Sequence, residues 1–143
     1  MDDVIEKIKE FLSDDLLELK EISRRQTYIT VSEERHFDFC KYLFEELGGR
    51  FATATGMDTG DGFEVLYHFC FDSMNRVITV RVKTKGRDSE LNSLAPFLPA
   101  AEWIEREVHD LLGINFKGHP GLERLILDDS WPEGEYPLRK EKR

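Results

Sequence analysis

WIEREVHDLLGINFKGHPGLERLIL, which runs from Trp103 to Leu127, is the segment in which the local signals for helix and turn are densest. Pro99 suits the first turn of a helix, because the N–H that proline lacks has no helical partner there. Gly113 predicts the end of that helix, because glycine readily adopts the left-handed conformation that closes many helices. The predicted buried face consists of four apolar residues at helical spacing: Ile104, Val108, Leu111 and Leu112. The predicted solvent face consists of three charged residues spaced four apart: Glu102, Arg106 and Asp110.

Glu105 and His109 share a further face of this helix, and His119 can approach them through the glycine-rich turn that follows. A zinc site needs three or four ligands at defined spacing, and the sequence has no HExxH motif and no cysteines spaced as ligands. The nucleophile motif GxSxG and the phosphate-binding motifs GxGxxG and GxxxxGK(S/T) are also missing. A small enzyme using Glu105, His109 and His119 is therefore kept only as an alternative.

The whole sequence of 143 residues has the length of one domain, with 40% hydrophobic and 34% charged residues. Its net charge of −9 repels a phosphate backbone, so nucleic acid is not an expected partner. No apolar run reaches the roughly 18 residues of a membrane span, and the acidic N-terminus does not resemble a secretory signal, so we expect a cytoplasmic protein. Cys40 and Cys70 are expected to be small core residues.

Apolar spacing along the rest of the sequence predicts a two-layer α+β fold in the order αββαβββα. The expected elements are a helix at 3–12, a strand in which Leu17 and Leu19 alternate with charges, a strand at 28–31, a helix from Ser32 as N-cap to Gly48, strands at 51–55, 65–71 and 77–82, and the helix that starts at Pro99. Segment 86–98 is expected to be an apolar loop packed across the sheet. We expect one domain at 1–127 and an irregular C-terminal extension at 128–143.

The segment from Trp131 to Arg143 is expected to be a docking arm. It has two prolines and a glycine among charged residues, so it forms neither a stable helix nor a central strand. Burying Trp131, Tyr136 and Leu138 on the domain would offset only part of the entropy lost on ordering the segment. Four of the last five residues are basic, which on an acidic protein favours docking to a protein partner. A solvated tail is the alternative.

A series of fixed identities runs from the predicted helix into this arm: Glu105-Arg106-Glu107, Asp110-Leu111, Gly113-Ile114, Phe116, Gly118-His119-Pro120, Leu122, Arg124, Trp131 and Pro137-Leu138-Arg139-Lys140. This series resembles the signature of the thirty-kilodalton subunit of NADH:quinone oxidoreductase, respiratory complex I. So many identities in order over about 36 residues are far more specific than a single glycine motif. The predicted order of elements is also similar to that of the family's domain, so the resemblance covers the whole sequence.

The resemblance implies a non-catalytic subunit of a complex I-like, membrane-associated electron-transfer assembly, without a cofactor of its own. The family includes counterparts in membrane-bound nickel–iron hydrogenases and formate hydrogenlyase. The implied partners are the large subunit, which shapes the quinone pocket or carries the nickel–iron site, and the small iron–sulfur subunit. Contact with the membrane is implied only indirectly, through the complex at the cytoplasmic face.

Two departures from the complex I pattern leave the type of assembly open. Glu135-Tyr136 precedes Pro137 where a histidine is common, and Glu141 follows Lys140 where aspartate is usual. Both favour the hydrogenase-like relatives over an assembly fed by NADH, and the electron donor and acceptor stay open. A stand-alone protein-interaction domain is a further alternative. The residues expected to contact the partner are Glu105, Arg106, Asp110, Gly118, His119, Pro120, Arg124, Trp131, Tyr136, Pro137, Leu138, Arg139 and Lys140.

Overall fold

The computed structural model describes residues 3–87 and 90–121. These residues form a mixed α+β fold, which confirms the predicted class. In sequence order the elements are α1 (Asp3–Leu12), a 3-10 turn (Ser13–Asp15), β1 (Leu16–Glu21), β2 (Gln26–Val31), α2 (His36–Lys41), a π-helical turn (Tyr42–Glu46), β3 (Arg50–Asp58), β4 (Phe63–Phe71), a second 3-10 turn (Asp72–Met74), β5 (Arg76–Lys83), β6 (Glu90–Asn92), α3 (Ala100–Leu112) and β7 (Asn115–Lys117).

Five of the strands form one sheet in the order β1-β2-β5-β4-β3. Neighbouring strands run antiparallel, except that β2 and β5 run parallel with Ile29 opposite Val80. β6 and β7 form a separate parallel pair with Leu91 opposite Phe116. Side chains alternate along each strand, so one face of the large sheet is apolar, and on β5 this face consists of Ile78, Val80 and Val82, each 0% exposed.

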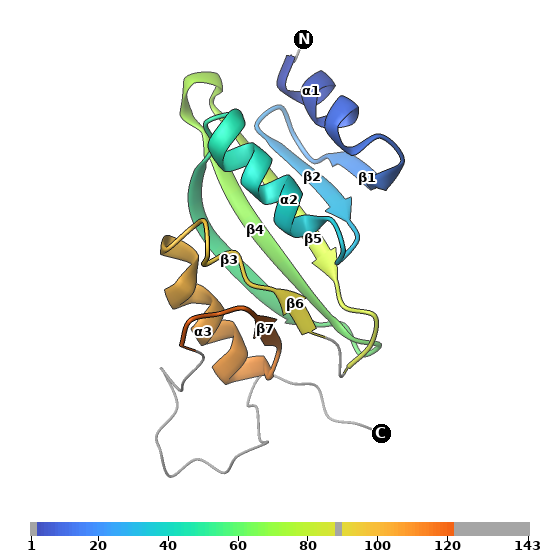
Figure 1. The fold of residues 1–143 in the computed structure, drawn as a ribbon. Coiled ribbons are helices and arrows are strands. Elements are labelled where there is room, and N and C mark those ends of the chain that lie inside the picture. The colour runs from blue at the N-terminus through green and yellow to red at the C-terminus, as the bar shows by residue number, and fades with distance from the viewer. Residues whose placement is uncertain (1–2, 88–89, 122–143) are drawn as a thin grey trace.

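The three helices pack on this apolar face. Figure 1 shows α1 beside β1 and β2, α2 across the middle of the sheet, and α3 beside β3. The amphipathic spacing of α1 places Ile5, Ile8 and Leu12 in the core, as predicted, with exposures of 2%, 0% and 1%. Within the described ranges, no helix is long and apolar enough to cross a membrane.

Helix α3 approaches β3 closely at Gly56. A Cβ atom at this position would lie 2.8 Å from Cδ1 of Leu112 and 2.8 Å from a methyl carbon of Val108. Carbon atoms of neighbouring side chains prefer separations of about 3.5–4.0 Å, so a larger residue would push the helix away. Gly56 therefore determines how closely α3, and the segment that follows it, lies against the sheet.

Two local expectations are wrong. Helix α2 begins at His36 and has no side-chain cap, because the residues before it form a turn in which the carbonyl of Ser32 accepts the Arg35 N–H at 3.0 Å. Leu17 does not alternate into the core but is 62% exposed, because β1 has a bulge between Leu16 and Glu18. A bulge adds one residue to the strand and reverses the side on which that residue points.

The exact predicted order is not reproduced, because the structure adds two short strands. β6 lies within the segment expected to be a loop, and β7 follows Gly113, whose φ of 79° closes α3 as predicted. Strands of three residues are too short to show an alternating pattern in the sequence. Leu91 and Leu94 of this segment are 1% and 0% exposed, so its apolar side chains do pack inward. The expected boundary after residue 127 and the extension at 128–143 lie outside the described residues.

Candidate partner-binding surface

Glu105 is the centre of the contact between α3 and the rest of the domain. Although it is an acidic residue, it is 0% exposed. Its carboxylate accepts hydrogen bonds from the Tyr67 hydroxyl at 2.8 Å, the Ser93 hydroxyl at 2.6 Å and the Leu94 N–H at 2.9 Å. Tyr67 belongs to β4, and Ser93 and Leu94 precede α3. One carboxylate therefore joins the helix, the sheet and the segment between them.

Burial raises the pKa of Glu105 above its usual value, and the hydrogen bonds from Leu94, Ser93 and Tyr67 counteract part of that rise. Burial also raises the pKa of Tyr67 well above its usual value, and the negative charge of Glu105 adds to this effect. The phenol of Tyr67 therefore remains a proton donor to the carboxylate. All three donors are neutral groups, and the charge of His119 makes a smaller contribution that also lowers the pKa of Glu105.

The side chain of His119 holds the turn that follows β7 in place through hydrogen bonds. Gly118 has a φ of 84°, a left-handed conformation that suits glycine. The Nε2 atom of His119 donates to the carbonyl of Glu102 at 2.9 Å, and Nδ1 accepts the N–H of Gly121 at 3.0 Å. Backbone groups thus engage both ring nitrogens and hold the turn against the first turn of α3.

The three candidate catalytic residues do not form an open reactive site. Glu105 is fully buried among its donors, and the ring of His119 is held by backbone groups. The Nδ1 atom of His109 donates to the carbonyl of Ile114 at 2.8 Å, which directs this ring to the start of β7. In the part of the sequence that the structure describes, no group of three or more His, Cys, Asp and Glu side chains is placed to bind a metal ion.

The solvent face predicted for α3 is wrong at Asp110, which is 2% exposed. The predicted buried residues Ile104 and Leu111 are only partly buried. The face that packs inward consists instead of Ala101, Glu105, Val108 and Leu112. This face is rotated relative to the prediction because Glu105 points at the sheet, where Tyr67 can reach it.

The predicted partner-contact residues fall into three groups. Gly118 and Pro120 are exposed and Arg106 and His119 are partly exposed, so these four can face a partner. Glu105 and Asp110 are buried, and their contribution is to hold the surface in position. The remaining predicted contacts lie outside the described residues: Arg124, Trp131, Tyr136, Pro137, Leu138, Arg139 and Lys140.

The sequence reasoning missed His36, which connects α2 with β6. It is 0% exposed, its Nε2 atom lies 2.8 Å from the carbonyl oxygen of Asn92, and its Nδ1 atom lies 3.2 Å from that of Glu33. Burial lowers the pKa of His36, and the two carbonyl oxygens oppose that change. Tyr67 and Ser93, the hydrogen-bond partners of Glu105, were also missed, because nothing in their local sequence indicates that contact. The inward position of Glu105 could have been inferred from its spacing, since it follows Ala101 by four residues on the same helix face.

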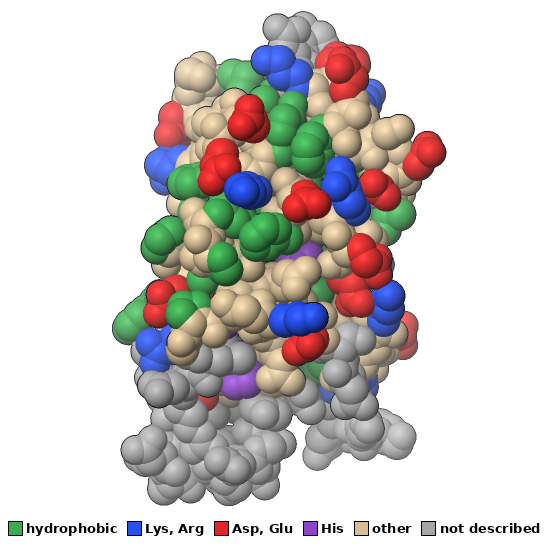
Figure 2. All heavy atoms as spheres, in the orientation of Figure 1, with side chains coloured by type: hydrophobic (Ala, Val, Ile, Leu, Met, Phe, Trp, Pro, Cys, Tyr) green, Lys and Arg blue, Asp and Glu red, His purple; other side chains and the backbone are tan. Residues whose placement is uncertain are grey.

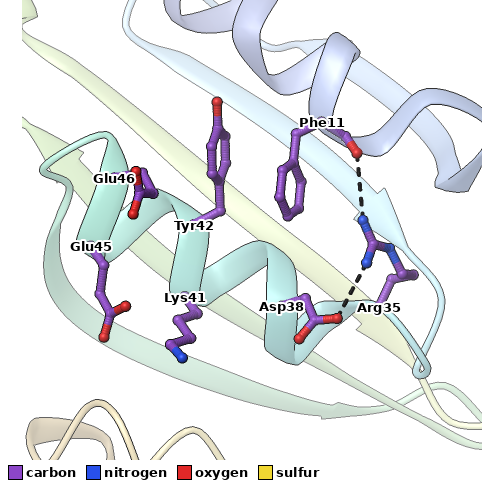
Figure 3. A pocket seen from close by; sticks show the side chains of 7 residues that line it. All are labelled: Phe11, Arg35, Asp38, Lys41, Tyr42, Glu45 and Glu46. Atoms are coloured by element: carbon purple, nitrogen blue, oxygen red, sulfur yellow. Dashed lines mark hydrogen bonds and ion pairs between the residues drawn. The ribbon is translucent and has the colours of Figure 1, made fainter.

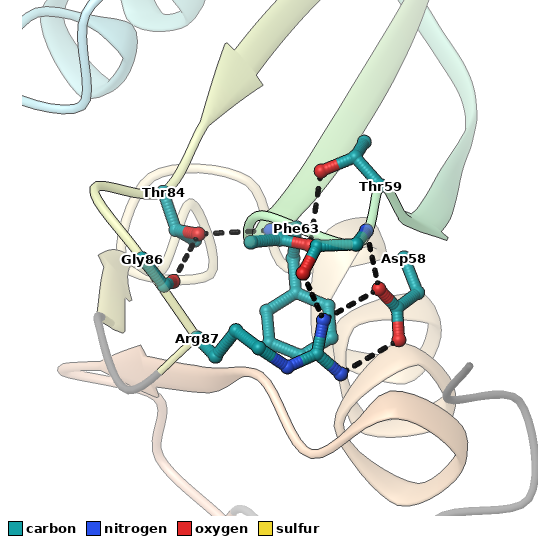
Figure 4. A network of polar contacts seen from close by, with 8 residues as sticks. Asp58, Thr59, Phe63, Thr84, Gly86 and Arg87 are labelled. Carbon is teal, nitrogen blue, oxygen red and sulfur yellow. Dashed lines mark hydrogen bonds and ion pairs between the residues drawn. The ribbon is translucent and has the colours of Figure 1, made fainter. Parts of the chain in front are cut away.

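A second network of polar contacts holds the segment that follows β5 against the turn between β3 and β4 (Figure 4). Arg87 donates to both carboxylate oxygens of Asp58, at 2.7 and 2.8 Å, and its guanidinium lies 4.9 Å from the centre of the Phe63 ring. The Thr84 hydroxyl accepts the Phe63 N–H at 3.0 Å and donates to the carbonyl of Gly86 at 2.6 Å. These bonds connect the turn between β3 and β4 with the segment that continues toward β6.

The helix-covered face presents apolar side chains between charged ones (Figure 2). Phe97 packs against Phe37 in an edge-to-face contact, with ring centres 5.2 Å apart, and against Phe44 at 6.2 Å. All three rings are only partly buried. Trp103, two residues before Glu105 and hence on the opposite side of α3, is 61% exposed. Apolar groups of this size at the surface are available for contact with another protein.

Comparison with known proteins identifies related sequences. A family model described as the 30 Kd subunit of respiratory-chain NADH dehydrogenase matches residues 29–143. An NADH-quinone oxidoreductase subunit of Rhodobacter capsulatus is 36% identical over 128 residues, which are 85% of this sequence and 62% of that protein. The subunit of the same name in Citrifermentans bemidjiense is 32% identical over 139 residues, which are 94% of this sequence and 84% of that protein. The present sequence thus spans less than two thirds of the first relative and most of the second.

Two solved structures have the same fold. One polypeptide of the membrane-bound sulfane sulfur reductase, an archaeal respiratory membrane complex, matches with a TM-score of 0.82 and 25% identity, over 95% of this protein and 81% of that polypeptide. The trypsin-resistant fragment of Nqo5 matches with a TM-score of 0.68 and 22% identity, over 83% of this protein and 96% of the fragment.

Proposed function

The chain belongs to the family of the 30 Kd subunit of respiratory-chain NADH dehydrogenase, and we propose that it is a non-catalytic subunit of a complex I-like, membrane-associated electron-transfer assembly. The observation that carries the proposal is the extent of the family match. It runs from residue 29 to residue 143 and so includes most of the sheet, α3, the His119 turn and the predicted arm.

The geometry around α3 supports a docking role rather than chemistry. Glu105 and His119 are engaged by groups of the protein itself, so their function is to fix α3 and the turn in place. The turn gives the segment that follows it a defined starting point on the domain. A fixed starting point lowers the entropy that the following segment loses when it binds a partner.

In the proposed assembly the region from Gly118 to Lys140 docks on the large subunit of the peripheral arm, and a small iron–sulfur subunit belongs to the same complex. The basic C-terminal residues suit a protein partner, because the rest of the sequence is acidic. The protein has no redox cofactor of its own, and it reaches the cytoplasmic face of the membrane only through the complex.

Two types of assembly are compatible with the relatives. The curated relatives of Rhodobacter capsulatus and Citrifermentans bemidjiense are NADH-quinone oxidoreductase subunits, whereas the sulfane sulfur reductase polypeptide belongs to another respiratory membrane complex. The departures at Tyr136 and Glu141 favour the hydrogenase-like type. A neighbouring gene for a large subunit with nickel-ligating cysteines would support a hydrogenase, and a large subunit without them would support a quinone-type reductase.

Affinity purification of the tagged full-length protein from membranes of its source cell tests the proposal. We expect recovery of a hydrogenase-like large subunit together with a small iron–sulfur subunit. A variant truncated after Leu127 should keep its thermal unfolding midpoint and lose both partners. Recovery of the intact protein without either subunit would support the stand-alone interaction domain instead.

Charge reversal refines this test at two basic pairs. Arg139→Glu with Lys140→Glu should reduce recovery of the large subunit, because the pair lies in the proposed contact. The matched control is Arg24→Glu with Arg25→Glu in the exposed turn between β1 and β2, which changes the net charge equally and should leave recovery unchanged. Turnover by the purified protein that disappears in His119→Ala would favour the small-enzyme alternative.

A further inference from the structure

A groove between α1 and α2 lies outside the α3 region and has no part in the proposed docking of the arm (Figure 3). It has a volume of about 440 Å³ and is lined by Phe11, Arg35, Asp38, Lys41, Tyr42, Glu45 and Glu46. Its floor is aromatic, because the rings of Phe11 and Tyr42 stack with centres 4.1 Å apart and planes 8° from parallel. Both rings are only partly buried.

Arg35 lies at one end of the groove and contacts both helices. Its guanidinium lies 5.0 Å from the centre of the Phe11 ring and forms ion pairs with Asp15 at 3.0 Å and Asp38 at 3.2 Å. It also donates to the carbonyl of Phe11 at 3.4 Å. The two carboxylates neutralise Arg35 and leave this end with an excess of negative charge.

The other end carries two further acids on an unusual backbone. Tyr42–Glu46 form a π-helical turn, a rare conformation that occurs frequently at functional sites. Tyr42, Glu45 and Glu46 of this turn all line the groove. In Figure 3 the Tyr42 side chain is directed toward α1, and the Glu45 side chain is directed away from it. Glu45 and Glu46 are exposed, and Lys41 is the one basic residue among the exposed lining residues.

We infer that this groove is a second docking surface, which binds a lysine- or arginine-rich segment of another subunit. The aliphatic part of such a side chain suits the aromatic floor, while its charged end reaches Glu45 or Glu46. Three acids and two bases line the groove, and Asp15 adds a fourth acid beside Arg35, so the groove has a net negative charge. This charge disfavours the alternatives, since a second copy of this protein has a net charge of −9 and a lipid surface or nucleic acid is also anionic. The inference rests on the proposed function in one respect, namely that the protein is part of an assembly.

Site-specific cross-linking in the purified assembly tests the inference. A benzophenone amino acid introduced at Lys41 of the full-length protein should, on irradiation, cross-link to a Lys- and Arg-rich peptide of another subunit, identified by mass spectrometry. Glu45→Lys with Glu46→Lys should lower the cross-link yield about fivefold or more, since two attractive contacts become repulsive. Glu21→Lys with Asp61→Lys, at exposed positions outside the groove, changes the net charge equally and should leave the yield unchanged.

Several outcomes would overturn the inference. One is a cross-link to the wrong target: a second copy of the protein, its own Arg139–Arg143 segment, or an acidic or uncharged peptide. Another is the absence of any cross-link while the protein is bound in the assembly. If the protein recovers no subunits at all, the proposed function is wrong. If it recovers the subunits but shows none of the expected cross-links, only the inference about the groove is wrong, so the two results can be distinguished. An equal loss of yield in the control variant would attribute the effect to net charge and would also overturn it.

Discussion

Two buried carboxylates, Glu105 and Asp58, are stabilised in different ways. Glu105 is 0% exposed and accepts hydrogen bonds from neutral groups of Tyr67, Ser93 and Leu94. Asp58 is 8% exposed and accepts hydrogen bonds from the two terminal nitrogens of the Arg87 guanidinium, and Arg87 is itself partly exposed. Glu105 joins three parts of the core, whereas Asp58 joins two turns at the edge. The stability of the α3 region should therefore depend on a single side chain more than the stability of the turns around Asp58 and Arg87 does.

The largest expected effect comes from removing the central acceptor. Glu105→Ala should lower the free energy of unfolding by about 3 kcal/mol or more, because three buried donors lose their acceptor at once. Urea denaturation followed by circular dichroism measures this change. Glu105→Gln is the matched control, since it keeps the shape and one acceptor, and it should cost about half as much. Equal losses in both variants would contradict the assigned role of the carboxylate.

A smaller effect is expected at the edge. Asp58→Ala should lower the free energy of unfolding by about 2 kcal/mol, because Arg87 loses a bidentate partner but keeps some access to water. Arg87→Lys retains the charge and loses the paired geometry, so it should cost less than Asp58→Ala. The same urea measurements apply. If Asp58→Ala lowered the free energy of unfolding more than Glu105→Ala does, the expected order of the two sites would be wrong.

Removal of one donor should have a still smaller effect. Tyr67→Phe deletes the hydroxyl that donates to Glu105 and preserves the ring, so the expected loss is about 1 kcal/mol. In a double-mutant cycle with Glu105→Ala, the two losses should not add, because both variants remove the same hydrogen bond. Additive losses would mean that the 2.8 Å bond contributes little to stability.

The smallest expected effect is a pH dependence specific to Glu105. Because the pKa of Glu105 is raised in the folded state, that state keeps the proton longer than the unfolded polypeptide does. The contribution of Glu105 to stability should therefore be largest at low pH and decline as the pH rises from about 4.5 through the folded-state pKa. The unfolding free energy of the wild type minus that of Glu105→Gln, measured between about pH 4 and 7, should show this decline. A difference that rises with pH would contradict it.

The sequence predicted those elements whose pattern is local and long. The helix at Asp3–Leu12 and the strands β4 and β5 have enough residues for their apolar spacing to be recognised. The end of α3 at Gly113 was also predictable, because a single residue type accounts for that conformation. Ser32 misled the prediction because a residue suited to capping a helix can equally begin a turn.

The site was less predictable because its partners are distant in the sequence. Tyr67 and Glu105 are 38 residues apart, so no local window contains both members of the bond. A glutamate in a helix is normally assigned to the solvent side, since acids are rarely fully buried. The family resemblance identified the α3 region as important without indicating that Glu105 faces inward. The family assignment was nevertheless confirmed, because a series of identities in order does not depend on knowing the contacts.

The parallel pairing of β2 with β5 has a consequence for how the protein folds. β5 lies between β2 and β4, and so between the antiparallel pairs β1–β2 and β3–β4. Each of these pairs can form from neighbouring sequence, but they can join only after β5 has been synthesised. On the ribosome, a nascent polypeptide that ends before Arg76 therefore leaves the inner edges of β2 and β4 unpaired. Those two edges are where a stalled or truncated product would associate with other polypeptides.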